Sequence, residues 1–177
     1  ARFLREKAII FGSFTLASKQ QSDYYCDGKQ ATLSGEGLSL IIDAILQETR
    51  DVEFDAIGGM DMGATPIAPA VAYRLFQLGR NVPSFVVRKE VKSHGTMKAI
   101  EGPLPHSPSR VVILEDVVTS GGSLLKAIDV VRAAGHEVVL AISVLDREAG
   151  GGEALRARGV HYQPLVTISE LGLSGGG

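Results

Sequence analysis

The segment from Val111 to Ser123 limits the possible folds of this 177-residue chain more than any other stretch of it. Its first four residues, 111–114, are all apolar, which is typical of a strand buried on both faces of a sheet. Two adjacent carboxylates, Glu115 and Asp116, come at the end of this strand, and a turn of small residues, 119–123, opens directly into a helix. A strand of this kind indicates a sheet that helices cover on both sides.

The same segment carries groups that suit a sugar phosphate. A turn at a helix N-terminus presents backbone N–H groups to a phosphate dianion, and the hydroxyls of Thr119, Ser120 and Ser123 add donors. Gly121 and Gly122 let the backbone come close to such a ligand. Adjacent carboxylates can accept hydrogen bonds from a vicinal diol and stabilise nearby positive charge. A strand with a capping acid and a glycine turn is the plain structural alternative, but it leaves the acidic pair without a packing purpose.

Strands and helices alternate along the rest of the chain. A helical pattern begins at Ser34, where apolar residues between 38 and 46 share one face. Thr65 is expected to cap a second helix, with Pro66 in its first turn, and a third helix is expected over 124–134. The expected strands are 54–57, 84–87, 111–114, 138–145 and 162–166.

This alternation with short connections predicts an α/β fold: a mainly parallel sheet flanked by helices. Residues 9–11 stay ambiguous between a helix end and a short strand that Gly12 breaks. Ligands of such sheets bind beyond the carboxyl ends of the strands. The chemistry is therefore expected in the loops after four strand ends: Ile57, Val87, Leu114 and Leu145.

Composition narrows the class of protein further. With 45% hydrophobic residues and a length typical of one domain, the chain can bury a core and is not expected to be disordered. Its single Cys excludes an internal disulfide, so a reducing cytoplasm is the expected compartment. A net charge of -2 gives no support for binding to nucleic acid or to a membrane surface. No apolar run approaches the length that spans a bilayer.

A basic loop follows the predicted strand at 84–87. Four of its side chains could together neutralise a polyphosphate of high charge: Arg88, Lys89, Lys92 and His94. The continuation after Gly95 is typical of a lid that closes over a substrate and excludes water. A solvated charged loop is the alternative. The position of the loop, on the same sheet edge as the phosphate turn, favours the functional interpretation.

The segment 111–123 resembles the phosphoribosyl-pyrophosphate signature of the type I phosphoribosyltransferases. The resemblance implies the fold of that family and a role for Glu115 and Asp116 in holding the ribose 2- and 3-hydroxyls. It also implies that the 5-phosphate binds in the turn that runs on from the acidic pair, formed by Val117, Val118, Thr119, Ser120, Gly121, Gly122 and Ser123.

The basic loop narrows the resemblance, because 88–95 is similar to the catalytic loop of orotate phosphoribosyltransferases. From this similarity, Arg88 and Lys89 are expected to bind pyrophosphate. Lys92 and His94 are expected to reach the pyrophosphate in the active site of the neighbouring subunit. A homodimer with the loop 88–98 contributed in trans is therefore implied, although Thr96 and Met97 depart from the acidic, Gly-rich continuation of many relatives.

Three further segments resemble parts of the same family. Residues 58–65 resemble the loop that contacts pyrophosphate and place Asp61 near Mg²⁺-bound oxygens. Residues 146–151 resemble the segment whose Arg, here Arg147, pairs with the orotate carboxylate, beside Thr119. Residues 1–33 resemble an N-terminal hood over the base. Ala17 stands where relatives carry a substrate-binding Lys, and Lys19 is the candidate replacement.

The resemblance implies one phosphoribosyltransferase domain over 1–177, acting on orotate and phosphoribosyl pyrophosphate in pyrimidine synthesis. Mg²⁺ is the implied cofactor. It would be held mainly through the substrate, with no direct protein ligand, and with Asp61 or Asp116 contacting it through water. Two alternatives stay open: a phosphoribosyltransferase for a purine or another base, and a regulatory protein that keeps the site as a sensor. Cys26, His106, His136 and His161 form no cluster at metal-ligand spacing and receive no role.

Overall fold

A computed structural model describes residues 1–15, 21–90 and 99–174, which form two sheets and their flanking helices. The larger sheet has six strands in the order β5-β4-β3-β6-β7-β8, and the smaller one pairs β1 with β2. The strands are β1 (Ile9–Thr15), β2 (Gln21–Cys26), β3 (Ala56–Met60), β4 (Ser84–Val87), β5 (Ile100–Glu101), β6 (Arg110–Val118), β7 (Glu137–Asp146) and β8 (Tyr162–Thr167). The helices are α1 (Arg2–Lys7), α2 (Lys29–Thr32), α3 (Gly35–Glu48), α4 (Ile67–Gln77), α5 (Gly122–Ala133), α6 (Gly151–Ala157) and the 3₁₀ turn η1 (Ser169–Leu171).

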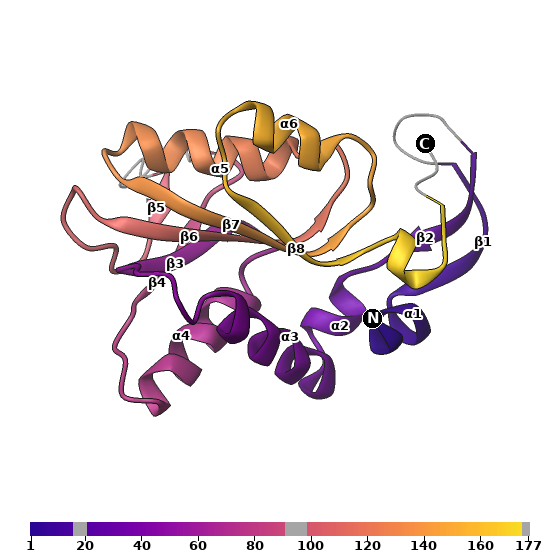
Figure 1. The fold of residues 1–177 in the computed structure, drawn as a ribbon, viewed down its shortest axis with the longest axis horizontal. Coiled ribbons are helices and arrows are strands. Elements are labelled where there is room, and N and C mark those ends of the chain that lie inside the picture. Colours follow the sequence, from indigo (N-terminus) through magenta and orange to yellow (C-terminus); the bar gives the residue numbers. More distant parts are fainter. Residues whose placement is uncertain (16–20, 91–98, 175–177) are drawn as a thin grey trace.

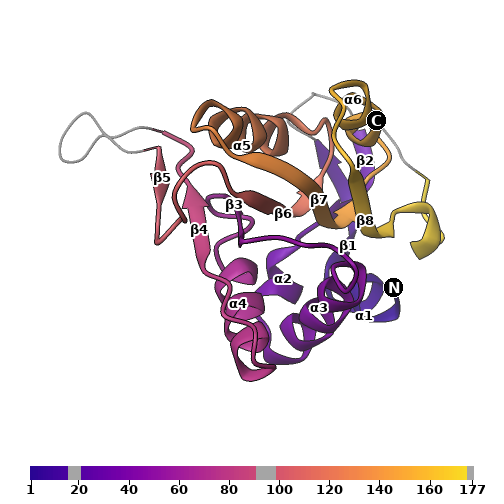
Figure 2. The same ribbon diagram turned by 60° about the vertical axis from the view of Figure 1, so that its left-hand side comes forward.

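The larger sheet is the middle layer of three. Helices α5 and α6 cover one face, and α1 to α4 lie on the other (Figures 1 and 2). Each face has its own buried cluster, one around Ile128 and Val131 of α5 and the other around Ile41 and Ile45 of α3. Central strand β6 is buried from Val111 to Asp116 and again at Val118, with Val117 half-buried. This arrangement confirms the predicted α/β class with a mainly parallel sheet.

Strand direction gathers the loops that were expected to carry chemistry. Every neighbouring pair of the larger sheet is parallel except β4 with β5. The carboxyl ends of β3, β4, β6, β7 and β8 therefore lie along one edge, which we call the carboxyl edge. Ligand sites of parallel sheets form at such an edge.

Several element boundaries differ from the prediction. Strand β6 does not end at Leu114 but continues through the acidic pair to Val118, because β7 pairs with it along that whole stretch. Pro66 is the N-cap of α4, and the Thr65 hydroxyl donates to Asp61 Oδ1 at 2.9 Å instead of capping the helix. Gly12 does not break β1, which only shifts its register between Phe11 and Phe14.

Other local predictions agree with the structure. The Ser34 side chain accepts the backbone N–H of Gly37 at 3.1 Å and caps α3 as expected. Four short elements had no clear sequence signal: α1, α2, α6 and β5. Helices this short span too few turns for apolar periodicity to show. None of the helices in the described ranges combines the length and apolarity needed to cross a bilayer.

Candidate active site

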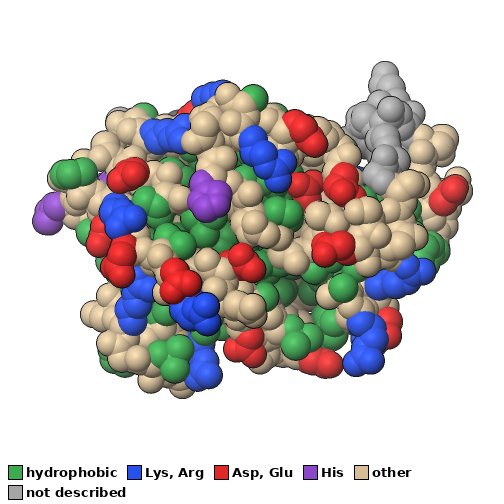
Figure 3. Space-filling view, viewed as in Figure 1, with side chains coloured by type: hydrophobic (Ala, Val, Ile, Leu, Met, Phe, Trp, Pro, Cys, Tyr) green, Lys and Arg blue, Asp and Glu red, His purple; other side chains and the backbone are tan. Residues whose placement is uncertain are grey.

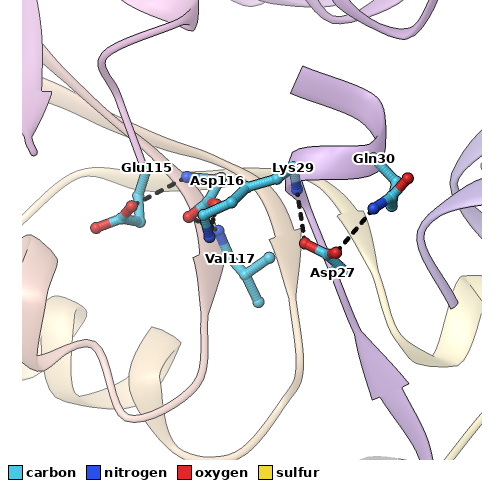
Figure 4. Close-up of polar contacts among 6 residues, drawn as sticks. All are labelled: Asp27, Lys29, Gln30, Glu115, Asp116 and Val117. Carbon is cyan, nitrogen blue, oxygen red and sulfur yellow. Dashed lines mark hydrogen bonds and ion pairs between the residues drawn. The ribbon is translucent and has the colours of Figure 1, made fainter. Parts of the chain in front are cut away.

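The acidic pair lies within β6, near the end of this strand at the carboxyl edge. Glu115 and Asp116 keep only 6% and 9% of their surface exposed. Their carboxylates turn back onto the strand: the Asp116 N–H donates to Glu115 Oε1 at 3.1 Å, and the Val117 N–H donates to Asp116 Oδ1 at 2.8 Å. Lys29 of α2 approaches from the hood side, with its Nζ 3.8 Å from Asp116 Oδ2 (Figure 4).

The positive charge near this buried pair is too weak to keep both of its carboxyl groups ionised. Burial is the main cause that raises the pKa of Glu115, from 4.5 to about 8, and the hydrogen bond and charge of Asp116 raise it further. Lys29 opposes the rise only weakly, because it is half exposed and its ion pair with Asp116 is long. A ligand that brings hydroxyl donors or positive charge to this position would complete the site.

The raised pKa of Glu115 predicts pH-dependent stability of the ligand-free protein. Between about pH 4.5 and pH 8, folded Glu115 keeps a proton that the unfolded chain releases. Its contribution to the free energy of unfolding is therefore complete below this range and is lost as the pH rises through it. We expect Glu115→Gln to abolish a decline of up to about 1.4 kcal/mol per pH unit, measured by urea unfolding.

The control for this experiment is Glu53→Gln, at an exposed loop position. This variant should retain the decline of the wild type. Parallel stability curves for wild type and Glu115→Gln across the same pH range would mean that Glu115 is ionised in the folded state.

Gly63 brings the loop after β3 against the acidic pair. A Cβ at this position would lie 1.8 Å from Glu115 Oε1 and 2.7 Å from Asp116 Oδ1. No side chain fits there without displacing a carboxylate. Gly28, at the start of α2, is similarly close, since its Cβ would lie 2.9 Å from Val117 and 3.3 Å from Asp116 Oδ2. Two backbone segments thus enclose the pair.

The phosphate turn forms a small hollow directly beyond the acidic pair. This hollow has a volume of about 130 Å³ and is lined by Glu115 and by residues 117–124. Gly121 adopts a left-handed conformation with φ of 78° and serves as the N-cap of α5, which no side chain of the described residues caps. The first N–H groups of α5 are therefore left for a ligand, and an anion is the ligand that a helix N-terminus favours.

Arg147 lies on the neighbouring strand end and is joined to the phosphate turn. Its backbone N–H donates to the Val118 carbonyl at 2.9 Å. Arg147 is only 9% exposed, and its Nε has no hydrogen-bond partner among the described residues. The guanidinium carbon lies 5.7 Å from the centre of the Tyr24 ring on β2. A buried guanidinium with an unused donor suits an anionic ligand.

Cys26, the last residue of β2, lies near the Arg147 charge. Burial raises the pKa of its thiol, and the nearby Arg147 charge opposes that rise. The sequence indicated no role for Cys26, and in the structure it packs, partly buried, against the core cluster that contains Ile41 and Ile45.

The predicted pyrophosphate residues are only partly brought together. The Asp61 N–H donates to the Val87 carbonyl at 2.8 Å, so Asp61 and Arg88 share the carboxyl edge. Arg88 is paired with Glu101 of β5 at 2.7 Å, and the Lys89 carbonyl accepts from Lys126 at 2.6 Å. Lys92, His94 and Lys19 lie outside the described residues.

Sequence reasoning did not single out Lys29, and it expected Gly63 only as part of the pyrophosphate loop 58–65, not against the acidic pair. Lys29 follows an Asp-Gly pair, and the Asp27 carboxylate accepts its backbone N–H at 3.2 Å (Figure 4). Only the fold brings this turn to the acidic pair. A larger hollow, about 510 Å³, lies between α1, α3, β7 and β8, but it contains neither the acidic pair nor the phosphate turn. The carboxyl edge is therefore the candidate site.

Comparison with known proteins assigns the chain to a family. It matches the phosphoribosyl transferase domain over residues 33–156, and it belongs to that family. It is 42% identical over 171 residues to the orotate phosphoribosyltransferase of Streptomyces coelicolor, covering 96% of this chain and 93% of the relative. Within the family, the chain belongs with the orotate phosphoribosyltransferases.

Solved structures agree with this assignment. Orotate phosphoribosyltransferase of Mycobacterium tuberculosis in complex with Fe(III) dicitrate has a TM-score of 0.85 at 36% identity, covering 97% of this chain and 96% of that one. The same mycobacterial enzyme in complex with phosphoribosyl pyrophosphate has a TM-score of 0.81 at 33% identity, with the same coverage of each chain. The family and fold predicted from 111–123 are confirmed, while the roles of single site residues stay predictions.

Proposed function

We propose that this chain transfers the phosphoribosyl group of phosphoribosyl pyrophosphate to orotate, giving orotidine 5'-phosphate and pyrophosphate in pyrimidine synthesis. One arrangement carries the proposal. The buried acidic pair, the hollow of the phosphate turn and the buried guanidinium of Arg147 lie together at one sheet edge. They match in order the diol, the phosphate and the carboxylate of the two substrates.

The chemistry follows from where charge develops during the reaction. The bond from ribose C1 to the pyrophosphate oxygen breaks, and a bond from C1 to orotate N1 forms. Positive charge grows on the ribose ring beside Glu115 and Asp116, which stabilise it. Negative charge grows on pyrophosphate, where Arg88 and Lys89, with Lys92 and His94 of the basic loop, would meet it. Orotate reacts as an anion, so the site needs no strong protein base.

Mg²⁺ is proposed as the cofactor, bound mainly to the oxygens of phosphoribosyl pyrophosphate. Within the described ranges, no three His, Cys, Asp or Glu side chains gather into a metal cluster. The acidic pair nevertheless supplies buried carboxylate oxygens short of positive charge, and Mg²⁺ prefers oxygen ligands. Asp116, or the exposed Asp61, would contact the ion through water. The ion would neutralise charge on the leaving group.

A spectrophotometric assay of orotate consumption tests the proposed function. The purified chain with phosphoribosyl pyrophosphate and Mg²⁺ should consume orotate and release pyrophosphate. Turnover of adenine or xanthine in place of orotate would instead indicate an enzyme for another base. Binding of phosphoribosyl pyrophosphate without turnover of any base would indicate a sensor.

We also propose a homodimer in the cytoplasm, with the loop 88–98 acting in trans. Exposed apolar side chains support a second copy: Leu40 on α3, Phe76 and Leu78 at the end of α4, and Met62 beside Asp61. Apolar side chains reach the surface over the region of α3 and α4, and charges of both signs are mixed over the face shown (Figure 3). The single Cys favours a reducing compartment.

Lys92→Ala is expected to lower kcat at least about tenfold while the fold stays intact, because a cation that meets the leaving pyrophosphate is lost. The measurement is the orotate assay, with circular dichroism as the check on folding. Lys7→Ala, in α1 and away from the carboxyl edge, is the control and should keep the wild-type kcat. An unchanged kcat in Lys92→Ala would remove the basic loop from the mechanism.

Mixing two variants that are each strongly impaired tests whether the loop acts in trans. A Lys92→Ala chain keeps its acidic pair, and an Asp116→Asn chain keeps its loop. In a mixed dimer, one of the two sites would combine both intact parts. Random exchange of subunits should therefore restore about a quarter of the wild-type activity. No recovery after verified exchange would mean that each loop serves its own subunit.

A further inference from the structure

A buried polar network lies behind Arg147, in residues that the proposed mechanism does not use. The Tyr162 hydroxyl, on edge strand β8, donates to Asp146 Oδ2 at 3.0 Å. The same hydroxyl lies 2.6 Å from Ser143 Oγ on β7. All three residues are buried, with Ser143 fully so and Tyr162 and Asp146 at 4% and 5% exposed. Burying polar groups costs free energy, so a buried polar network of this kind suggests a structural or functional role for its members.

The Asp146 carboxylate connects this network to the turn that carries Arg147. While Oδ2 accepts from Tyr162, Oδ1 accepts the backbone N–H of Glu148 at 2.8 Å. One carboxylate thus closes the turn across Arg147, which stands between these two residues. Burial raises the pKa of the Tyr162 phenol above its ordinary value, which keeps the hydroxyl protonated as a donor.

The turn itself needs such support. Glu148 has a φ of 53°, in the left-handed region that non-glycine residues rarely adopt. Its side chain is fixed by Ser169, whose N–H and hydroxyl donate to the two carboxylate oxygens at 2.9 and 3.1 Å. Strained backbone of this kind persists only where the surroundings hold it, and it is common at ligand sites.

Strand register places this support next to the phosphate turn. Asp146 pairs with Val118 on β6 and with Thr167 on β8. The Arg147 N–H then donates to the Val118 carbonyl. A shift of the Asp146 carboxylate would therefore move the base of the Arg147 side chain relative to the phosphate hollow. Recognition of a carboxylate by a guanidinium fork tolerates only small displacements.

We propose that Tyr162 is a positioning residue for the base substrate: its hydroxyl holds the Asp146 carboxylate, and Asp146 holds the turn that presents Arg147 to the substrate carboxylate. This inference rests on the proposed function, since it names orotate as the ligand of Arg147. Tyr162 does not touch the substrate. The ring of Tyr162 packs in the core around α5 and α6, so its packing and its hydroxyl have separable roles.

Tyr162→Phe separates these roles because it removes only the hydroxyl. We expect its KM for orotate to rise about fivefold, with kcat and the KM for phosphoribosyl pyrophosphate within about twofold of wild type. Ser109→Ala is the matched control. It removes another buried hydroxyl, 2.6 Å from His136 Nδ1, at the opposite end of β6 and β7, and it should leave both KM values unchanged.

A double-mutant cycle with Arg147→Lys distinguishes positioning from a general loss of structure. If Tyr162 acts through the guanidinium, Tyr162→Phe should raise the KM for orotate in wild type but change it less than about twofold in the Arg147→Lys background. An equal rise in both backgrounds, or no rise in wild type, would overturn the proposal.

The wild-type assay keeps the two levels of inference apart. Absence of orotate turnover by the unmodified chain would overturn the proposed function and this inference together. Orotate turnover by wild type with an unaltered KM in folded Tyr162→Phe would overturn the positioning role alone. Should Tyr162→Phe fail to fold, Ser143→Ala replaces it in the cycle, because Ser143 fixes the same hydroxyl from β7.

Discussion

Gly63→Ala is expected to reduce kcat/KM for phosphoribosyl transfer at least about a hundredfold while the protein remains folded. The added Cβ would stand 1.8 Å from Glu115 Oε1 and 2.7 Å from Asp116 Oδ1, well inside contact distance. Strand β6 cannot retreat, because β3 and β7 are hydrogen-bonded to its two sides. The carboxylates must therefore rotate out of the position in which they would meet the ribose hydroxyls.

Gly35→Ala is the matched control for this substitution. Gly35 is the first residue of α3, and a Cβ there would meet no atom of the described residues within 4 Å. This variant should keep the wild-type kcat/KM, and the thermal unfolding of both variants should be measured beside it. Wild-type activity in a folded Gly63→Ala protein would show that the acidic pair does not need the position seen here.

The contrast between 111–123 and Gly63 shows how far local sequence can predict this site. The acidic pair, the small turn and the following helix are contiguous, so their chemistry could be recognised in one stretch of chain. Gly63 meets Glu115 only because β3 and β6 are neighbours in the sheet. Nothing local to residue 63 specifies that neighbour, and the glycine was expected only within a pyrophosphate loop.

Strand β6 shows a second limit of prediction from sequence, because its end could not be located from the residue pattern. An apolar run predicts a buried strand, and polar residues are usually taken to end it. Here the pairing of Glu115 with Ser143 and of Val117 with Leu145 keeps the strand going and buries the carboxylates within it. This burial produces the raised pKa of Glu115, a property that no residue pattern could have predicted.

Lys29 and Tyr162 are two residues near the site whose roles could not be predicted from their own stretches of sequence. Lys29 reaches Asp116 from a helix of four residues, which is too short to give a periodic signal. Tyr162 begins a strand that the sequence did predict. Its hydroxyl can bind the Asp146 carboxylate only because β8 pairs with β7 in the sheet. Residues that support a site from a neighbouring strand are found from topology, whereas Arg147 could be proposed from its own segment.

Arg147→Lys is expected to lower kcat/KM for orotate about fiftyfold, chiefly through a higher KM. The side chain is 9% exposed, and its Nε has no partner among the described residues, so a bound carboxylate would supply hydrogen bonds that the protein does not. Lysine keeps the positive charge but offers a single ammonium in place of the planar fork, and it is too short to reach the same point. The loss therefore measures two-pronged recognition rather than charge alone.

Specificity gives the more decisive readout for the same variant. Uracil lacks the carboxylate of orotate, so we expect wild type to turn it over poorly. That rate should change less than about threefold in Arg147→Lys, and the preference for orotate should fall accordingly. Arg158→Lys is the control, because this exposed arginine pairs with Asp129 at 2.7 Å and lies outside the carboxyl edge. If orotate and uracil lose activity equally, Arg147 supports the fold of the turn and does not read the carboxylate.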